Sequence, residues 1–129
     1  MTTLDQIDPA LIGFDSVSVD DLERMQAVDR DALAFGVIGF SESNEVEIYN
    51  ATESKLAGLR PDRVIGESLF ISVAPCMNNF LVAQRFEDEA ELDEVIDYVF
   101  TLRMRPTKIK LRMLKQSGVA RRYILVVRR

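Results

Sequence analysis

Apolar and polar residues alternate in several short stretches of the chain, a period of two that is typical of half-buried β-strands. The clearest stretch is 107–115, TKIKLRMLK, in which isoleucine, leucine and methionine alternate with lysine and arginine. Pro106 separates it from an apolar, partly aromatic strand predicted at 94–104, so these two strands should form a hairpin. Further strands are predicted at 33–40, 45–49 and 121–127.

Helix signals lie between the strands predicted at 45–49 and 94–104. Residues 50–59 should form a short helix that Asn50 caps and Gly58 ends. Glu53 stands three residues after the cap and completes a capping-box pattern. Residues 78–91 combine apolar positions with an acidic tail and predict one amphipathic helix.

The order of the predicted elements indicates an α+β fold. Two strands, several short helices and three final strands can join into one five-stranded antiparallel sheet with the helices on one face. A PAS-like domain has this order of elements. Residues 1–32 are polar and acidic, and we expect them to form an N-terminal cap on a PAS-like domain at 33–129.

Charge is segregated along the chain, which has a net charge of −5. All 21 acidic residues lie at or before Asp97, whereas residues 103–129 hold ten of the 16 basic residues and no acidic one. A basic block can bind nucleic acid. Here the basic residues follow a strand pattern, so we expect them to lie beside acidic helices and loops and to bind no nucleic acid.

The chain contains one cysteine, Cys76, and no histidine. A single cysteine permits no internal disulfide, which fits a reducing cytoplasm. Without histidine there is no Cys-His or Ser-His-Asp nucleophile and no usual metal ligand, so neither an enzyme nor a metal site is expected. No signal peptide and no stretch of about 20 apolar residues is present, so we expect a cytoplasmic protein away from membranes.

Three blocks of the sequence resemble the photoactive yellow protein family, whose members are PAS-fold blue-light receptors. The blocks are LAFGVIGF…IYNATE at 33–53, VIGESLFISVAPC at 64–76 and YVFTLRMRPTKIKL at 98–111. The resemblance implies that the cysteine of VAPC, Cys76, carries p-coumaric acid as a thioester. It also implies chromophore-binding roles for four further residues, namely Tyr49, Glu53, Phe100 and Met104.

The implied roles of Tyr49 and Glu53 agree with simple electrostatics. A buried phenolate is unfavourable unless hydrogen-bond donors satisfy it. Glutamate donates only when it is protonated, and burial raises its pKa in that direction. Tyr49 and Glu53 stand four residues apart and share a face if the predicted helix includes both. A light-driven proton shift from Glu53 would leave a buried carboxylate and loosen the N-terminal cap.

The sequence departs from the family at three positions near the implied site. Ala57 and Leu59 stand where threonine and arginine are usual, and Leu102 stands where tyrosine is common. Arg60 is one position away from the missing arginine and is a candidate to replace it.

Two other function classes stay open. One is a chromophore-free PAS module that binds a partner protein or a small ligand, and the other is an enzyme, for which only Glu53 offers a base. A receptor of this family must pass its signal on, so we expect a downstream signalling protein as partner. We expect the chain itself to be a monomer or a weak dimer.

Overall fold

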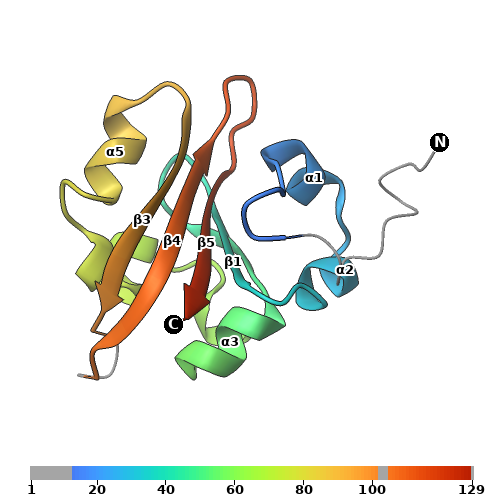
Figure 1. Cartoon of the computed structure of the whole chain (residues 1–129), viewed down its shortest axis with the longest axis vertical. Helices are drawn as coiled ribbons and strands as arrows, with labels where there is room; N and C mark the ends of the chain where they lie inside the picture. The colour runs from blue at the N-terminus through green and yellow to red at the C-terminus, as the bar shows by residue number, and fades with distance from the viewer. Residues whose placement is uncertain (1–12, 102–104, 129) are drawn as a thin grey trace.

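The computed structural model describes residues 13–101 and 105–128 (Figure 1). The helices of the N-terminal segment are α1 (Val19–Arg24) and α2 (Ala27–Asp31). The strands are β1 (Gly36–Phe40), β2 (Val46–Tyr49), β3 (Leu92–Phe100), β4 (Thr107–Lys115) and β5 (Arg122–Arg128). The connection from β2 to β3 contains α3 (Ala51–Ala57), α4 (Pro61–Val64), the π-helix η3 (Leu69–Val73), the 3₁₀-helix η4 (Pro75–Met77) and α5 (Ala83–Asp88). Within the two described ranges, no helix has the length and apolar character needed to cross a membrane.

All five strands form one antiparallel sheet in the order β2-β1-β5-β4-β3. The last strand of the chain therefore lies at the centre, where Ile124 pairs with Ile38 of β1 and with Met113 of β4. Strand β4 occupies the predicted range, whereas β3 begins at Leu92 and ends at Phe100 instead of spanning 94–104. The sheet and its short helices confirm the predicted α+β fold.

Alternation along the central strands gives the sheet two buried faces. On one face Ile38 and Val126 belong to a core that also includes residues of α4, η3, η4 and α5. On the other face Val37 and Leu125 pack with Leu22 of α1 in a second core. Figure 1 shows α1 and α5 on opposite sides of the sheet. The N-terminal segment therefore covers a sheet face that would otherwise expose apolar side chains.

The predicted helix at 78–91 is wrong in its first part, because only α5 is helical. The Oδ1 atom of Asn79 accepts hydrogen bonds from the backbone N–H groups of Leu81 and Val82, at 3.0 and 3.2 Å. This side chain stabilises a turn in place of the first helical turn. Val82 is buried there while Phe80 is 74% exposed, so the apolar run does not mark one helix face.

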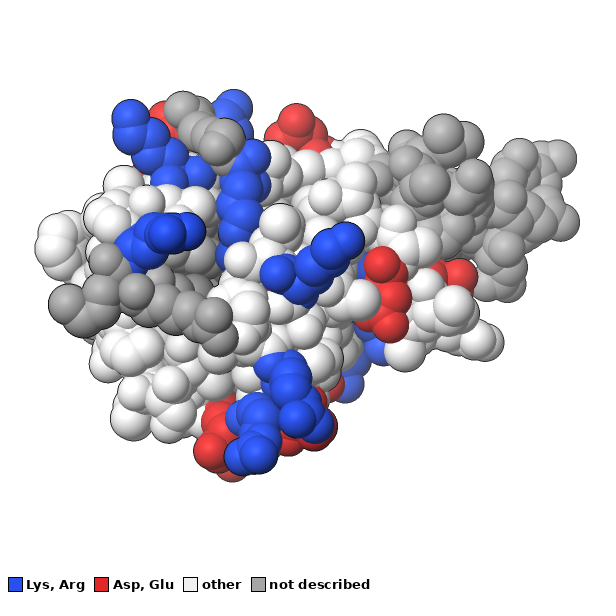
Figure 2. Space-filling view, turned by 90° about the horizontal axis from the view of Figure 1, so that it is seen from below, with Lys and Arg blue, Asp and Glu red and all other residues white. Residues whose placement is uncertain are grey.

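Basic residues of the C-terminal half pair with acidic residues from the first half. Arg121 contacts Glu23 at 3.1 Å and Glu47 at 2.9 Å. Figure 2 shows Lys and Arg side chains on one face that are separated by uncharged surface and that in places lie directly beside Asp and Glu. Glu23 lies in α1 and Arg121 directly precedes β5, so this pair agrees with the expected offset between basic strands and acidic helices, whereas Glu47 lies in strand β2.

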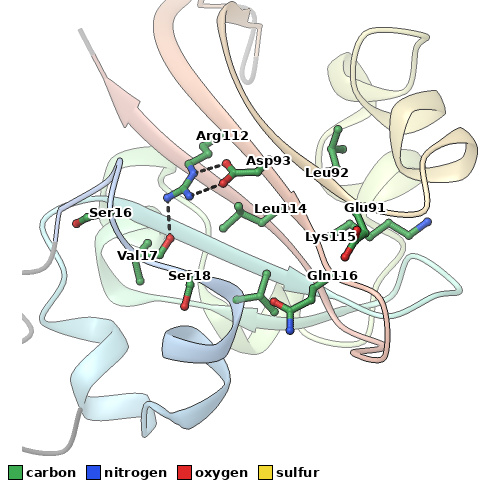
Figure 3. A pocket seen from close by; sticks show the side chains of 11 residues that line it. Ser16, Val17, Ser18, Glu91, Leu92, Asp93, Arg112, Leu114, Lys115 and Gln116 are labelled. Carbon is green, nitrogen blue, oxygen red and sulfur yellow. Dashed lines mark hydrogen bonds and ion pairs between the residues drawn. The ribbon is translucent and has the colours of Figure 1, made fainter. Parts of the chain in front are cut away.

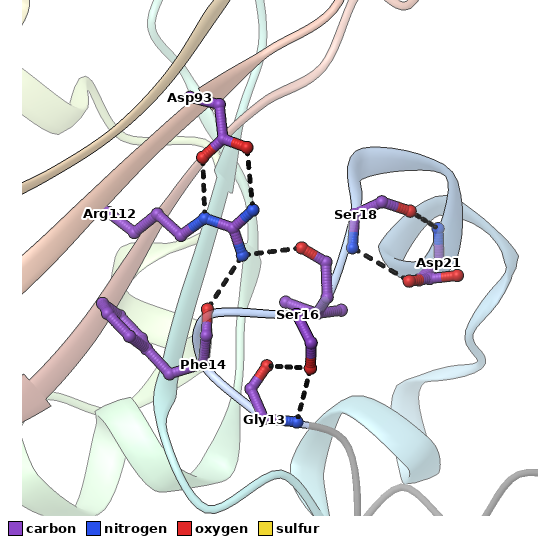
Figure 4. Close-up of polar contacts among 8 residues, drawn as sticks. Gly13, Phe14, Ser16, Ser18, Asp21, Asp93 and Arg112 are labelled. Carbon is purple, nitrogen blue, oxygen red and sulfur yellow. Dashed lines mark hydrogen bonds and ion pairs between the residues drawn. The ribbon is translucent and has the colours of Figure 1, made fainter.

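Arg112 of β4 joins the N-terminal segment to the sheet (Figure 4). Its Nε and Nη2 atoms donate to the two carboxylate oxygens of Asp93 on β3, at 2.8 and 3.0 Å, and hold the pKa of Asp93 below its usual value. Its Nη1 atom donates to the carbonyl oxygens of Phe14 and Val17, at 2.8 and 2.7 Å. The polar face predicted for β4 is therefore covered at Arg112, which is only 6% exposed.

A pocket of about 510 Å³ lies beside this contact, between residues 16–19 and the strands β3 and β4 (Figure 3). Its two basic side chains are Arg112 and Lys115. The Nζ atom of Lys115 donates to the carbonyl oxygens of Phe86 and Glu89, both at 2.7 Å. Both cations are thus engaged with the chain itself.

Replacing Arg112 with alanine should loosen the N-terminal segment. The carbonyl oxygens of Phe14 and Val17 lose a charged donor, and a buried polar group without its partner costs roughly 1–3 kcal/mol. We expect urea denaturation to show a loss of that size and hydrogen exchange to accelerate at the amides of α1. The control Arg63→Ala changes an exposed residue of α4 and should leave both measurements unchanged. Equal exchange rates at α1 in the two variants would contradict the role of Arg112.

Candidate functional site

Cys76 lies in the 3₁₀-helix η4, which Pro75 opens. Its side chain is half-buried and packs against the larger core. Its carbonyl oxygen accepts hydrogen bonds from the Tyr98 hydroxyl at 2.6 Å and from Nδ2 of Asn79 at 3.2 Å. Asn79 also donates to the Tyr98 hydroxyl oxygen at 2.7 Å. These contacts tie the cysteine backbone to β3 and limit where its sulfur can point.

Tyr49 is the last residue of β2, and Glu53 lies in the first turn of α3. Asn50 makes the junction between them. Its Oδ1 atom accepts hydrogen bonds from the N–H groups of Val37 and Glu53, and its Nδ2 atom donates to the carbonyl oxygen of Phe35. The predicted N-cap is therefore confirmed, and it also fixes the start of α3 to β1.

Two predictions about Glu53 need correction. The helix begins at Ala51, so Tyr49 is outside it and the two residues do not share a helix face. The Glu53 side chain does not complete a capping box, because the Asn50 N–H donates to the carbonyl oxygen of Val37. The carboxylate turns inward instead, where it is close enough to Tyr49 to help raise the pKa of that hydroxyl.

The carboxyl group of Glu53 is buried and paired with Arg128 of β5. The Nη1 and Nη2 atoms of Arg128 donate to Oε1 and Oε2 of Glu53, at 2.8 and 3.2 Å. Only 1% of the Glu53 side chain and 16% of the Arg128 side chain are exposed. Burial raises the pKa of Glu53, and the hydrogen bonds and charge of Arg128 oppose that effect only in part. Glu53 therefore takes up a proton more readily than an exposed glutamate does.

The pKa of the Tyr49 hydroxyl is also raised, chiefly by burial. Tyr49 is 5% exposed. Tyr49 is therefore a neutral phenol beside a buried carboxyl group.

Phe100 lies next to Arg128 at the edge of this group of side chains. It is 2% exposed, and the guanidinium carbon of Arg128 lies 5.9 Å from the centre of its ring. Its ring also meets Tyr98 edge to face, with centroids 6.2 Å apart. Phe100 thus stands between Arg128 on one side and the tyrosine that holds the Cys76 backbone on the other.

The structure brings the predicted site residues onto one side of the sheet. Tyr49 and Phe100 belong to the larger core, and Cys76 packs against that core. Glu53 joins them through Tyr49 and Arg128. Met104 lies outside the described residues, so its predicted role is not tested.

The structure also shows what lies near the positions where the usual threonine and arginine are replaced. Ala57 is buried and lines a pocket of about 460 Å³ together with Phe100 and Arg128. Arg60 does not reach the site, since its side chain is 72% exposed and pairs with Asp62 at 2.6 Å. The hypothesis that Arg60 takes the place of the missing arginine is therefore wrong.

Sequence reasoning missed Arg128, although a signal was present. Ile124 and Val126 alternate on β5 and face the larger core. The same period of two carries Arg128 to the same face, next to Glu53. A basic residue in phase with buried apolar residues indicates a buried partner of opposite charge.

The absence of a side chain at Gly36 of β1 leaves space for the Glu53 carboxylate. A Cβ atom at this position would lie 2.1 Å from Oε1 and 3.1 Å from Cβ of Glu53. Both distances are shorter than ordinary van der Waals contact. Any larger residue at this position would therefore have to displace the carboxylate.

The variant Gly36→Ala should displace the Glu53 carboxylate and destabilise the protein by roughly 1–3 kcal/mol, as overpacking a core does. Urea denaturation measures the change in the free energy of unfolding. In the double variant Gly36→Ala/Glu53→Ala, the closest contact is absent, so the alanine at position 36 should cost much less. Additive losses would show that the carboxylate is not what requires glycine.

No protein-family model matches the chain. It is similar to two curated proteins named photoactive yellow protein. The one from Rhodothalassium salexigens is 36% identical over 117 residues, which span 85% of this chain and 93% of the relative. The one from Halochromatium salexigens is 35% identical over 123 residues, which span 92% and 98%.

Solved structures are similar over the same range. The photoactive yellow protein domain of the sensor histidine kinase Ppr from Rhodospirillum centenum has a TM-score of 0.77 and 38% identity, over 84% of this chain and 97% of the domain. A PAS domain of an HTR-like protein from Haloarcula marismortui has a TM-score of 0.66 at 9% identity, over 86% and 100% of the two chains, and shows the fold alone. With more than a third of the aligned residues identical to those of two photoactive yellow proteins over most of both lengths, and with the PAS fold around its one cysteine, the chain belongs to the photoactive yellow protein family.

Proposed function

We propose that the protein is a blue-light photoreceptor that carries p-coumaric acid as a thioester on Cys76. The observation that carries the proposal is that Tyr49, in the core against which Cys76 packs, lies beside the buried Glu53. Family membership supports the same function. The three residues supply one attachment point and two hydrogen-bond donors in a largely apolar surrounding.

The residues present fit a phenolate ligand. Tyr49 is buried, and the hydroxyl of a neutral phenol is a donor for an anionic oxygen. Burial favours the protonated form of Glu53, which can donate as well. Phe100 would cover one side of the site, and Met104 keeps the role of promoting the return of the dark state that the resemblance implies.

Attachment requires an activated acyl donor. The Cys76 sulfur would form a bond to the acyl carbon, while the activating group leaves with the electron pair and the thiol proton is released. The Tyr98 hydroxyl and Asn79 would hold the backbone of Cys76 during this exchange. When bound, p-coumaric acid supplies a phenolate oxygen and a double bond that blue light isomerises.

The protein's own part in the response is a proton shift at Glu53. Glu53 donates its proton toward the site after light absorption and is left as a buried carboxylate, which is costly in this surrounding. Strand β5 carries Arg128 toward Glu53 and Leu125 toward the core of the N-terminal segment. A change at Glu53 can thereby reach residues 1–32, which we propose act as a cap on a sensor domain at 33–129.

The response would pass to another protein. In Rhodospirillum centenum, a photoactive yellow protein domain belongs to a sensor histidine kinase. By analogy, we propose a signalling protein as the partner of this chain and no enzymatic activity of its own.

A second candidate is a chromophore-free PAS module that binds a partner or a small ligand. The ion pair between Glu53 and Arg128 favours it, because it satisfies the buried carboxylate without any ligand. The two candidates differ in whether Cys76 is acylated. Mass spectrometry of the Cys76 peptide from the native host separates them, since a thioester adds the mass of the p-coumaroyl group.

Incubation of the purified protein with an activated ester of p-coumaric acid should give a yellow protein that bleaches in blue light and recovers in the dark. Cys76→Ala removes the one thiol of the chain and should stay colourless. The control Ile71→Ala changes a residue of η3 that is 74% exposed and should colour as the wild type does. A colourless wild type, or a yellow Cys76→Ala protein, would rule the proposal out.

A further inference from the structure

Arg128 is the one basic side chain in contact with Glu53 among the described residues. Both of its terminal nitrogens are used, and its planar group lies close to the ring of Phe100. Such a two-point contact fixes the guanidinium group in the site, as a single ammonium contact would not. Arg128 is therefore positioned by β5, by Glu53 and by Phe100 together.

The charge of Arg128 also reaches Tyr49. The Arg128 cation lowers the pKa of the Tyr49 hydroxyl, against the larger effects of burial and of Glu53. The other basic residues along the neighbouring pocket are Lys55 and Arg105, which are both exposed. Among residues 13–101 and 105–128, the titratable and charged groups that face Glu53 are thus Tyr49 and Arg128.

The position at which the family usually has an arginine is occupied by Leu59, and Arg60 points to solvent and pairs with Asp62. The site nevertheless contains a cation, which comes from the opposite end of the domain sequence.

We propose that Arg128 is the residue that binds the negative charge of this site, first that of Glu53 and then that of a bound phenolate. The inference rests on the proposed function and deepens it.

Before the ligand is attached, the site contains the Arg128 cation and the Glu53 carboxylate. As a phenol enters, its proton moves to Glu53 and the phenolate faces Arg128. One proton, one negative charge and one positive charge are present in both states, so the buried charge stays balanced throughout. Neutral ligands without an ionisable hydroxyl would leave Arg128 on Glu53.

The first test needs no chromophore. Carboxyl ¹³C NMR measures the pKa of Glu53 in the wild type, in Arg128→Gln and in the matched control Arg60→Gln. Removing a cation at this distance should raise the pKa of Glu53 by roughly 1–3 units, whereas Arg60→Gln should leave it unchanged. If Arg128→Gln does not fold, Arg128→Lys keeps the charge, loses the two-point contact and should give a smaller rise. An unchanged pKa of Glu53 in the folded Arg128 variant overturns the inference.

The second test uses the loaded protein. Absorbance during a pH titration gives the midpoint at which the yellow phenolate form is lost. This midpoint should rise by roughly 1–3 units in Arg128→Gln, because the phenolate loses its cation, and should not move in Arg60→Gln. A yellow wild type whose midpoint matches that of Arg128→Gln overturns the inference and leaves the proposed function intact. A wild type that never becomes yellow refutes the proposed function. In that case the carboxyl titration of the first test still shows whether Arg128 binds the charge of Glu53.

Discussion

The carboxyl group of Glu53 is buried almost completely, and much of the domain is arranged to permit this. A charge in an apolar interior is stable only with a partner and hydrogen bonds. Arg128 supplies the partner, Gly36 supplies the space and Asn50 fixes the helix from which the carboxylate projects. These residues come from β5, β1 and the start of α3, so the carboxylate links three elements that are distant in sequence.

The central position of β5 makes this link important for the rest of the fold. Its residues alternate between the two cores, so that Val126 faces the site and Leu125 faces the N-terminal segment. A strand cannot rotate one set of side chains without moving the other. A change in charge at Glu53, which Arg128 of β5 contacts, can therefore reach the packing of the N-terminal segment through one backbone.

Local patterns in the sequence predicted a strand or helix well where regular alternation or a capping residue is enough to fix it. The alternation at 107–115 gives β4, and Asn50 and Gly58 bound α3 as expected. The helix predicted at 78–91 failed because the Asn79 side chain competes for the backbone N–H groups that a helix would use. Such competition is decided by local geometry that apolar spacing does not reveal.

Contacts between distant residues were harder to predict than elements. The resemblance named Tyr49, Glu53 and Phe100, which are all buried in the structure. Arg128 lies against two of them, Glu53 and Phe100. It did not name Arg128, because the pairing of β1 with β5 determines which basic residue reaches Glu53. The hydrogen bond from Tyr98 to the Cys76 backbone depends in the same way on the path of η4 past β3.

The contact of Arg112 with Asp93 and that of Arg128 with Glu53 differ in a way that suits a switch. Asp93 is 61% exposed, so water can replace Arg112 on its carboxylate, and water can also reach the carbonyl groups of Phe14 and Val17 once the N-terminal segment moves. Water cannot replace Arg128 on Glu53 without opening the core. In the proposed photoreceptor, an imbalance of charge created at Glu53 is therefore relieved most easily on the other face of the sheet, where the contacts of the N-terminal segment exchange with solvent.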